Sequence, residues 1–74
     1  MDTSAILRPE ELPFPVPKML ADDINALIAA IERDDLNVDC YENEVESCAR
    51  KLNEEQGMWV RRYYCRGGWQ RGEV

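Results

Sequence analysis

The stretch that decides the fold is residues 18–33, which read KMLADDINALIAAIER. Its large apolar side chains recur every three or four residues, so they share one face of an α-helix; they are Leu20, Ile24, Leu27, Ile28 and Ile31. Alanines between them favour the helix and allow another helix to approach closely. Pro17 suits a helix start, and Asp34 and Asp35 oppose continuation because negative charge is unfavourable at a helix C-terminus. We predict a helix over 18–33.

A second apolar series follows directly. Its members step by three and four residues and form a heptad-like seam; they are Val38, Tyr41, Val45, Cys48 and Leu52. Asn37 is suited to cap this helix, and Leu36 has the spacing to pack on Tyr41 as a hydrophobic staple. We predict a second helix over 38–52.

The third helix has a signal at each end. Asn53 followed by Gln56 has the spacing of a capping box, and Gly67 and Gly68 mark a helix stop. We predict a helix over 54–66, with Gly57 as its weak point because glycine costs about 1 kcal/mol against alanine inside a helix.

The helical wheel divides this third segment into two faces. One arc should face the core, and it holds Trp59, Val60, Tyr63 and Tyr64. The opposite arc holds Met58, Arg61, Arg62 and Cys65. Trp69 is expected to fold back after the two glycines, and residues 70–74 are expected to fray.

All four prolines lie in residues 8–17, RPEELPFPVP. Proline excludes a helix interior and favours extended geometry, so residues 1–17 are predicted to form an extended arm. Leu12, Phe14 and Val16 would lie on the helices as a strap, while an exposed ligand for a partner or a disordered segment stay as alternatives. No stretch alternates as a β-strand does. The predicted fold is therefore all-α: a small three-helix domain, residues 18–69, with a proline-rich N-terminal strap.

The composition excludes several classes of function. The chain has 74 residues, no histidine, three cysteines and a net charge of −6. Without histidine there is no Ser/His/Asp or Cys/His pair, and three cysteines without a CxxC fall short of a four-thiolate zinc site. We expect no enzyme activity and no cofactor. The chain shows no signal peptide and no membrane-spanning apolar segment, which favours a cytoplasmic protein with reduced thiols and no membrane association.

One acidic stretch has the ligand spacing of an EF-hand calcium loop. The matching positions are Asp35, Asn37, Asp39, Tyr41, Asn43 and Glu46. Cys40 stands where the loop needs glycine, and Glu42 replaces an apolar residue. We interpret the spacing as chance in a segment rich in Asp, Asn and Glu, and predict no metal site.

Charge is distributed unevenly along the chain. Residues 1–49 carry 12 acidic and 3 basic side chains, whereas residues 50–74 carry 3 acidic and 6 basic ones. This asymmetry predicts faces of opposite sign, although ordinary solvated helix faces would show the same counts. Arginine, tryptophan and methionine are enriched at protein interfaces. The predicted partner-binding residues are Met58, Arg61, Arg62, Arg66 and Trp69.

These features favour a non-enzymatic protein–protein interaction module, a small adaptor or regulator. Its third helix and C-terminal segment would dock on an acidic or mixed surface of a protein partner, or on the acidic face of a second copy.

A nucleic-acid-binding regulator is the alternative. Ala49 and Asn53 have the spacing of a helix-turn-helix, whose second helix would direct its arginines to phosphates or base edges. Glu54 and Glu55 at the reading end, and the acidic net charge, count against it. A further alternative is an acidic mimic of nucleic acid, built from the carboxylates of the first two helices.

Overall fold

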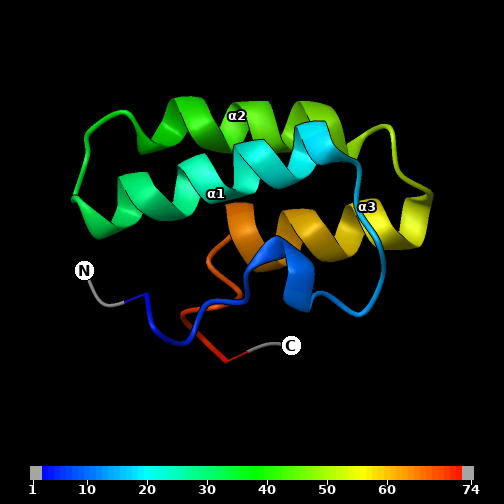
Figure 1. The fold of residues 1–74 in the computed structure, drawn as a ribbon, viewed down its shortest axis with the longest axis horizontal. Helices are drawn as coiled ribbons and strands as arrows, with labels where there is room; N and C mark the ends of the chain where they lie inside the picture. The colour runs from blue at the N-terminus through cyan, green and yellow to red at the C-terminus, as the bar shows by residue number, and fades with distance from the viewer. Residues whose placement is uncertain (1–2, 73–74) are drawn as a thin grey trace.

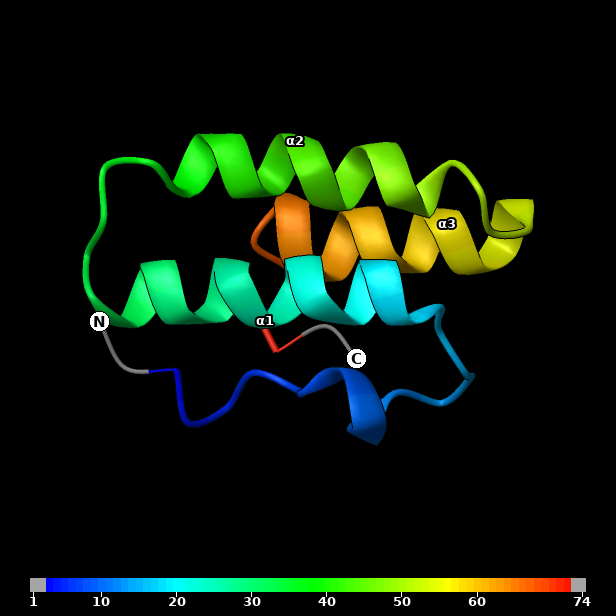
Figure 2. The ribbon, with the colours of Figure 1, turned by 45° about the horizontal axis from the view of Figure 1, so that its top comes forward.

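Three α-helices surround an apolar core in the computed structural model, which describes residues 3–72 (Figure 1). They are α1 (Lys18–Glu32), α2 (Val38–Ala49) and α3 (Glu54–Val60), and a π-helical turn, Arg61–Cys65, continues α3. Helices α1 and α2 run antiparallel side by side, and α2 and the N-terminal arm lie on opposite sides of the molecule in both views (Figures 1 and 2). The predicted all-α three-helix architecture is confirmed. None of the helices within residues 3–72 has the length and apolar character needed to span a bilayer.

Helix α1 supplies the centre of the core. Leu20, Ile24, Leu27 and Ile28 have no exposed surface, as their shared helical face predicts. The helix has Pro17 as its N-cap and Arg33 as its C-cap, so both predicted ends are confirmed.

The turn after α1 differs from the prediction. The N–H groups of Asp34 and Asp35 donate to the carbonyls of Ile31 (3.0 Å) and Ala30 (2.9 Å), a pattern that ends the helix with Asp34 in the left-handed region at φ 55°. The Asp35 carboxylate then accepts the N–H of Asn37 at 2.9 Å. Asn37 occupies the cap position of α2 without making a side-chain capping hydrogen bond.

This turn directs Leu36 into solvent, where 96% of its surface is exposed. The predicted hydrophobic staple between Leu36 and Tyr41 is therefore wrong. The seam of α2 is nevertheless confirmed: Val45 and Cys48 are buried, and Val38, Tyr41 and Leu52 are partly buried against the core.

Helix α2 ends at Ala49, three residues earlier than predicted, and α3 crosses close to this end. The Asn53 side chain accepts the N–H of Gln56 at 2.8 Å, which confirms the predicted cap of α3. A Cβ atom on Gly57 would lie 2.8 Å from the Ala49 carbonyl oxygen. Gly57, the predicted weak point, is thus the position at which the two backbones meet.

The π-helical turn of residues 61–65 was not predicted. A π-turn has one more residue per hydrogen-bonded ring than an α-turn. It accompanies the burial of two consecutive large side chains, Tyr63 (3% exposed) and Tyr64 (1% exposed), which pack edge to face with ring centroids 4.9 Å apart.

These two tyrosines hold the N-terminal arm. The Tyr64 hydroxyl donates to the Leu7 carbonyl at 2.6 Å, and the Tyr63 hydroxyl accepts the Leu7 N–H at 3.0 Å. Ile6 beside them is buried. Further along the arm, Phe14 and Trp59 pack edge to face with ring centroids 5.6 Å apart.

The arm is a strap, as predicted, because Leu12, Phe14 and Val16 pack partly buried against the core. It is not extended throughout: Pro9–Glu11 forms a 3-10 turn with proline at its first position. Residues 70–72, part of the tail that is predicted to fray, form consecutive turns hydrogen-bonded to residues 67–69. Residues 73–74 lie outside the described part of the chain, as do residues 1–2 of the arm.

We expect Gly57→Ala to destabilise the fold. Alanine would gain about 1 kcal/mol in helix propensity, but its Cβ would overlap the Ala49 carbonyl, and overpacking costs about 1–3 kcal/mol. The net loss should be about 1 kcal/mol in urea denaturation, while Met58→Ala, at an exposed position of the same helix, should change stability by less than about 0.5 kcal/mol. A more stable Gly57→Ala variant would contradict the close crossing.

We expect Tyr64→Phe to loosen the arm. The substitution leaves the Leu7 carbonyl without its partner, which costs about 1–3 kcal/mol at a buried site. Urea denaturation would measure the loss, and amide hydrogen exchange at Leu7 should accelerate. Tyr41→Phe is the control, since Tyr41 is half-buried and its hydroxyl makes no hydrogen bond within residues 3–72. Equal stability of the two variants would show that the arm does not depend on this bond.

Candidate functional site

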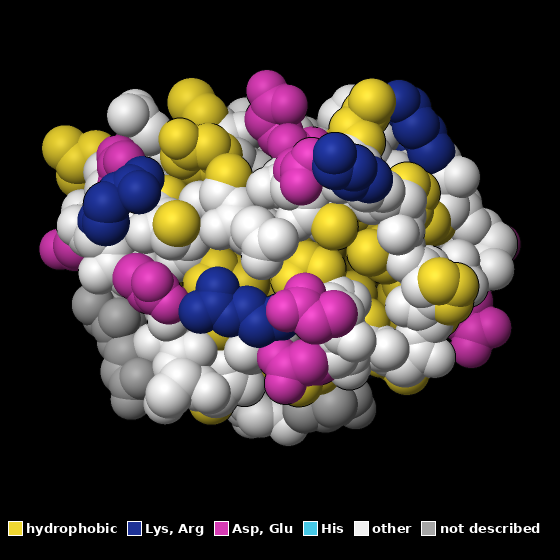
Figure 3. Space-filling view, in the orientation of Figure 1, with side chains coloured by type: hydrophobic (Ala, Val, Ile, Leu, Met, Phe, Trp, Pro, Cys, Tyr) yellow, Lys and Arg dark blue, Asp and Glu magenta, His cyan; other side chains and the backbone are white. Residues whose placement is uncertain are grey.

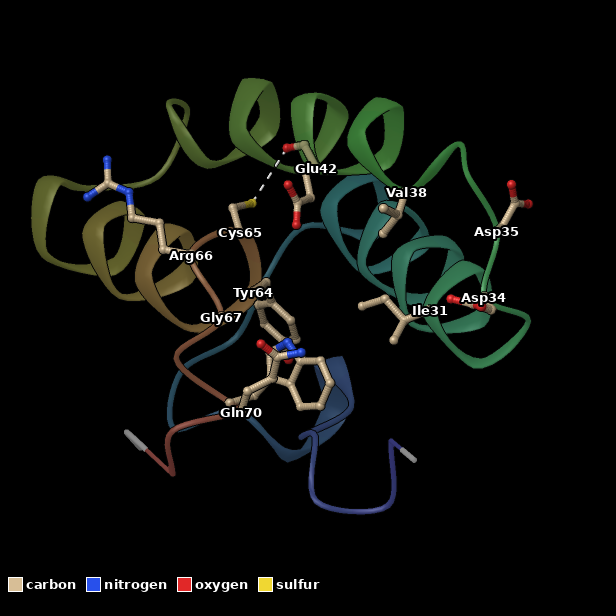
Figure 4. A pocket seen from close by; sticks show the side chains of 11 residues that line it. Ile31, Asp34, Asp35, Val38, Glu42, Tyr64, Cys65, Arg66, Gly67 and Gln70 are labelled. Carbon is tan, nitrogen blue, oxygen red and sulfur yellow. Dashed lines mark hydrogen bonds between the residues drawn. The ribbon is translucent and has the colours of Figure 1, made fainter. Parts of the chain in front are cut away.

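A groove of about 520 Å³ lies between the α1–α2 turn and the segment after α3 (Figure 4). Its walls come from three parts of the chain: the end of α1 with residues 34–35, the first two turns of α2, and residues 64–70. This volume falls within the range of about 300–1,000 Å³ that is usual for small-molecule sites.

Part of the groove lining is apolar. Ile31 and Val38 contribute partly buried side chains, whereas Tyr64 and Trp69 are almost fully buried behind the surface. Ile31 is the last residue of the α1 apolar face and Val38 the first of the α2 seam, so each stays only partly buried where its helix ends. This surface gives a ligand a place to bury apolar atoms.

Trp69 reaches the groove through a tight chain reversal. Gly67 has φ 72°, and a Cβ atom on Gly68 would lie 2.6 Å from the Arg62 carbonyl oxygen. The N–H groups of Gly68 and Trp69 donate to the carbonyls of Arg62 (3.0 Å) and Tyr63 (3.2 Å). The predicted fold-back of Trp69 is confirmed, and its side chain is 9% exposed.

The charged residues of the groove are mostly acidic. Asp34, Asp35 and Glu42 line it together with one base, Arg66. The carboxylates of Asp34 and Glu42 point into the groove from opposite sides, whereas Asp35 and Arg66 point away from it (Figure 4).

The carboxylates also differ in their partners. Asp35 accepts hydrogen bonds from Asn37 (2.9 Å) and Arg33 (3.4 Å), and these bonds lower the pKa of its carboxyl. The Asp34 and Glu42 carboxylates make no hydrogen bond or ion pair within residues 3–72. The groove therefore presents two unpaired acidic groups beside apolar surface.

Burial raises the pKa of the Glu42 carboxyl, and the neighbouring Asp39 carboxylate raises it further. Both effects disfavour the charged form. Burial also raises the pKa of the nearby Cys65 thiol to about 11, and this thiol donates to the Glu42 carbonyl at 3.5 Å. At neutral pH Cys65 is a protonated thiol, and the thiolate is the nucleophilic form.

The structure separates the five predicted partner-binding residues. Met58, Arg62 and Arg66 are exposed at intervals of four residues and form an outward row that begins on α3 and ends just after the π-helical turn. Arg61 turns toward α2, with its guanidinium 3.9 Å from the Glu46 carboxylate, and Trp69 is buried beside the groove. Arg66 and Trp69 are the two predicted residues that line the groove.

Sequence reasoning missed Ile31, Val38 and Glu42 as site residues. The sequence places Ile31 and Val38 on apolar helix faces, but it does not show that these two residues lie where the faces end. Glu42 follows Val38 by four residues, which places it on the same side of α2. This spacing is the sequence feature that could have placed Glu42 in the groove.

Charges on the surface are mixed. In the view of Figure 3, acidic and basic side chains lie interspersed, and apolar side chains gather where the arm passes between α1 and α3. Ion pairs also join the acidic and basic halves of the sequence, as between Arg61 and Glu46. On this face, the predicted separation into faces of opposite sign does not hold.

The EF-hand spacing falls mostly on a helix. Asp39, Tyr41, Asn43 and Glu46 belong to α2, whose successive turns cannot wrap an ion as a loop does. Among residues 3–72 there is no group of three or more Asp, Glu, Cys or His side chains arranged to hold a metal ion.

Comparison of the chain with protein-family models, curated proteins and solved structures finds no match.

We expect Glu42→Gln to stabilise the fold at neutral pH and to have no effect in acid. The raised pKa means that the folded state binds the proton more tightly than the unfolded chain, so wild-type stability falls as pH rises above the unfolded value of 4.5 and through the folded pKa. Glutamine keeps the size of the side chain without the charge. Thermal unfolding at pH 7 should show a higher Tm for Glu42→Gln, and the difference should vanish near pH 3.

The matched control is Glu44→Gln, an exposed position on the same helix, which should show no such pH-dependent gain. Equal behaviour of the two variants would show that Glu42 carries no burial cost.

Proposed function

We propose that this chain is a non-enzymatic protein–protein interaction module that binds its partner through the exposed row Met58, Arg62 and Arg66 and the adjoining groove. The observation that supports it best is the difference among the arginines of the third helix. Arg61 lies beside Glu46, whereas Arg62 and Arg66 extend into solvent without an ion pair within residues 3–72.

This row has the chemistry of a docking surface. Arginine and methionine are enriched at interfaces, and an exposed arginine gains charge-assisted hydrogen bonds when a carboxylate approaches. Met58, 51% exposed, adds apolar area at the start of the row. The complementary partner surface is acidic or mixed, on another protein or on a second copy of this chain.

We expect the double variant Arg62→Glu/Arg66→Glu to lose partner binding without losing its fold. Reversing two interface charges places like charges opposite each other, so affinity should fall more than tenfold. The tagged chain would be used to capture partners from a lysate of the cells that express it, with nuclease present, followed by mass spectrometry. Circular dichroism would verify that helicity is unchanged.

Arg50→Glu/Lys51→Glu is the matched control, because it makes the same charge change at exposed residues after α2. A stoichiometric partner captured by wild type and control but not by Arg62→Glu/Arg66→Glu supports the proposal. Equal capture by all three chains, or capture that nuclease abolishes, would contradict it, and the second result would favour the nucleic-acid alternative.

A further inference from the structure

The groove beside the row has features that the docking of arginines on an acidic surface does not use. It is concave, it holds apolar surface, and it directs two unpaired carboxylates inward from opposite sides (Figure 4). We propose that the groove receives an arginine side chain of a separate partner protein, not of a second copy of this chain. The proposal rests on the interaction function above and specifies the chemistry of the partner.

The acidic lining of the groove favours a cationic ligand. Three carboxylates line it against a single guanidinium, and that guanidinium, Arg66, points away from the space that Asp34 and Glu42 face. An anionic ligand would add repulsion to a site that already disfavours the ionised form of Glu42. A cation would instead be attracted by the carboxylates of Asp34 and Glu42.

The apolar part of the lining favours a ligand whose positive charge is carried on an aliphatic chain. Ile31 and Val38 line the groove with part of each side chain still exposed, and methylene groups laid on them would be removed from water. A bare metal ion or a free ammonium would leave this surface unused. Arginine and lysine both bury their stems while the charged head reaches polar groups.

The placement of the two carboxylates favours arginine over lysine. A guanidinium presents five N–H donors around a plane and is weakly hydrated, so it can serve carboxylates on two sides at a low desolvation cost. An ammonium is a compact and strongly hydrated charge. Asp34 and Glu42 reach the groove from opposite sides, so a group with donors on several edges suits them better than a single compact charge.

The backbone at Asp34 fits this role. Asp34 has φ 55°, a left-handed conformation that glycine adopts at lower cost. An aspartate here gives up that advantage and places a carboxylate at the mouth of the groove.

The test is an NMR titration of the isotopically labelled full chain with blocked arginine, N-acetylarginine N-methylamide. Blocked citrulline is the matched probe, since it has nearly the same shape without the charge, and blocked lysine tests the preference for a guanidinium. We expect saturable shifts at the methyl groups of Ile31 and Val38 and at the Trp69 indole N–H with blocked arginine. Blocked lysine should bind at least threefold more weakly, and citrulline should not saturate.

Variants locate the site. Glu42→Gln and Asp34→Asn should each weaken blocked arginine at least fivefold, and Glu44→Gln should leave it unchanged. No saturable shift with arginine, equal binding of citrulline, or full binding by both groove variants would overturn the proposal. Two groove variants are used, so that the result does not depend on a single variant that fails to fold.

Sedimentation equilibrium separates a partner protein from a second copy. A monomeric wild-type chain agrees with the proposal. A dimer that dissociates in both Glu42→Gln and Arg62→Glu would assign the arginine to a second copy and overturn the commitment to a separate partner.

Because blocked arginine needs neither Arg62 nor Arg66, failed lysate capture with intact arginine binding overturns the interaction function alone. Intact capture without arginine binding overturns the groove proposal alone.

Discussion

The hydrogen bond from the Tyr64 hydroxyl to the Leu7 carbonyl, 2.6 Å long, joins the two segments on which the rest of the structure depends. Tyr64 is almost fully buried, so this bond satisfies a polar group that would otherwise be costly inside the core. The same ring lines the groove, and the same arm covers the core beside Ile6. One residue of the third helix thus forms part of the groove wall and anchors the arm.

The sequence predicts those features that depend on neighbouring residues. The apolar face of residues 18–33, the Asn53 cap and the strap formed by Phe14 each follow from local spacing or local backbone limits. Features that depend on distant contacts were missed. Gly57 could not be assigned to a helix crossing without knowing that Ala49 lies above it.

The candidate site falls in the second group. Glu42 and Tyr64 are 22 positions apart, and only the packing of α2 against the third helix brings them to one groove. The predicted staple of Leu36 on Tyr41 is wrong for a related reason. The spacing for a staple is present, but the left-handed conformation of Asp34 directs the chain, and with it Leu36, into solvent. In both cases the path of the chain, which one-dimensional spacing does not encode, decides which side chains meet.

The long separation between the arm and its tyrosines has a consequence for the order of synthesis. Leu7 emerges from the ribosome 57 residues before Tyr64 does. Helices α1 and α2 can pair in the meantime, since their contacts are close in sequence. Ile6 and the apolar residues of the arm stay without their cover until the third helix is made, so the nascent chain exposes apolar surface throughout the synthesis of the residues in between.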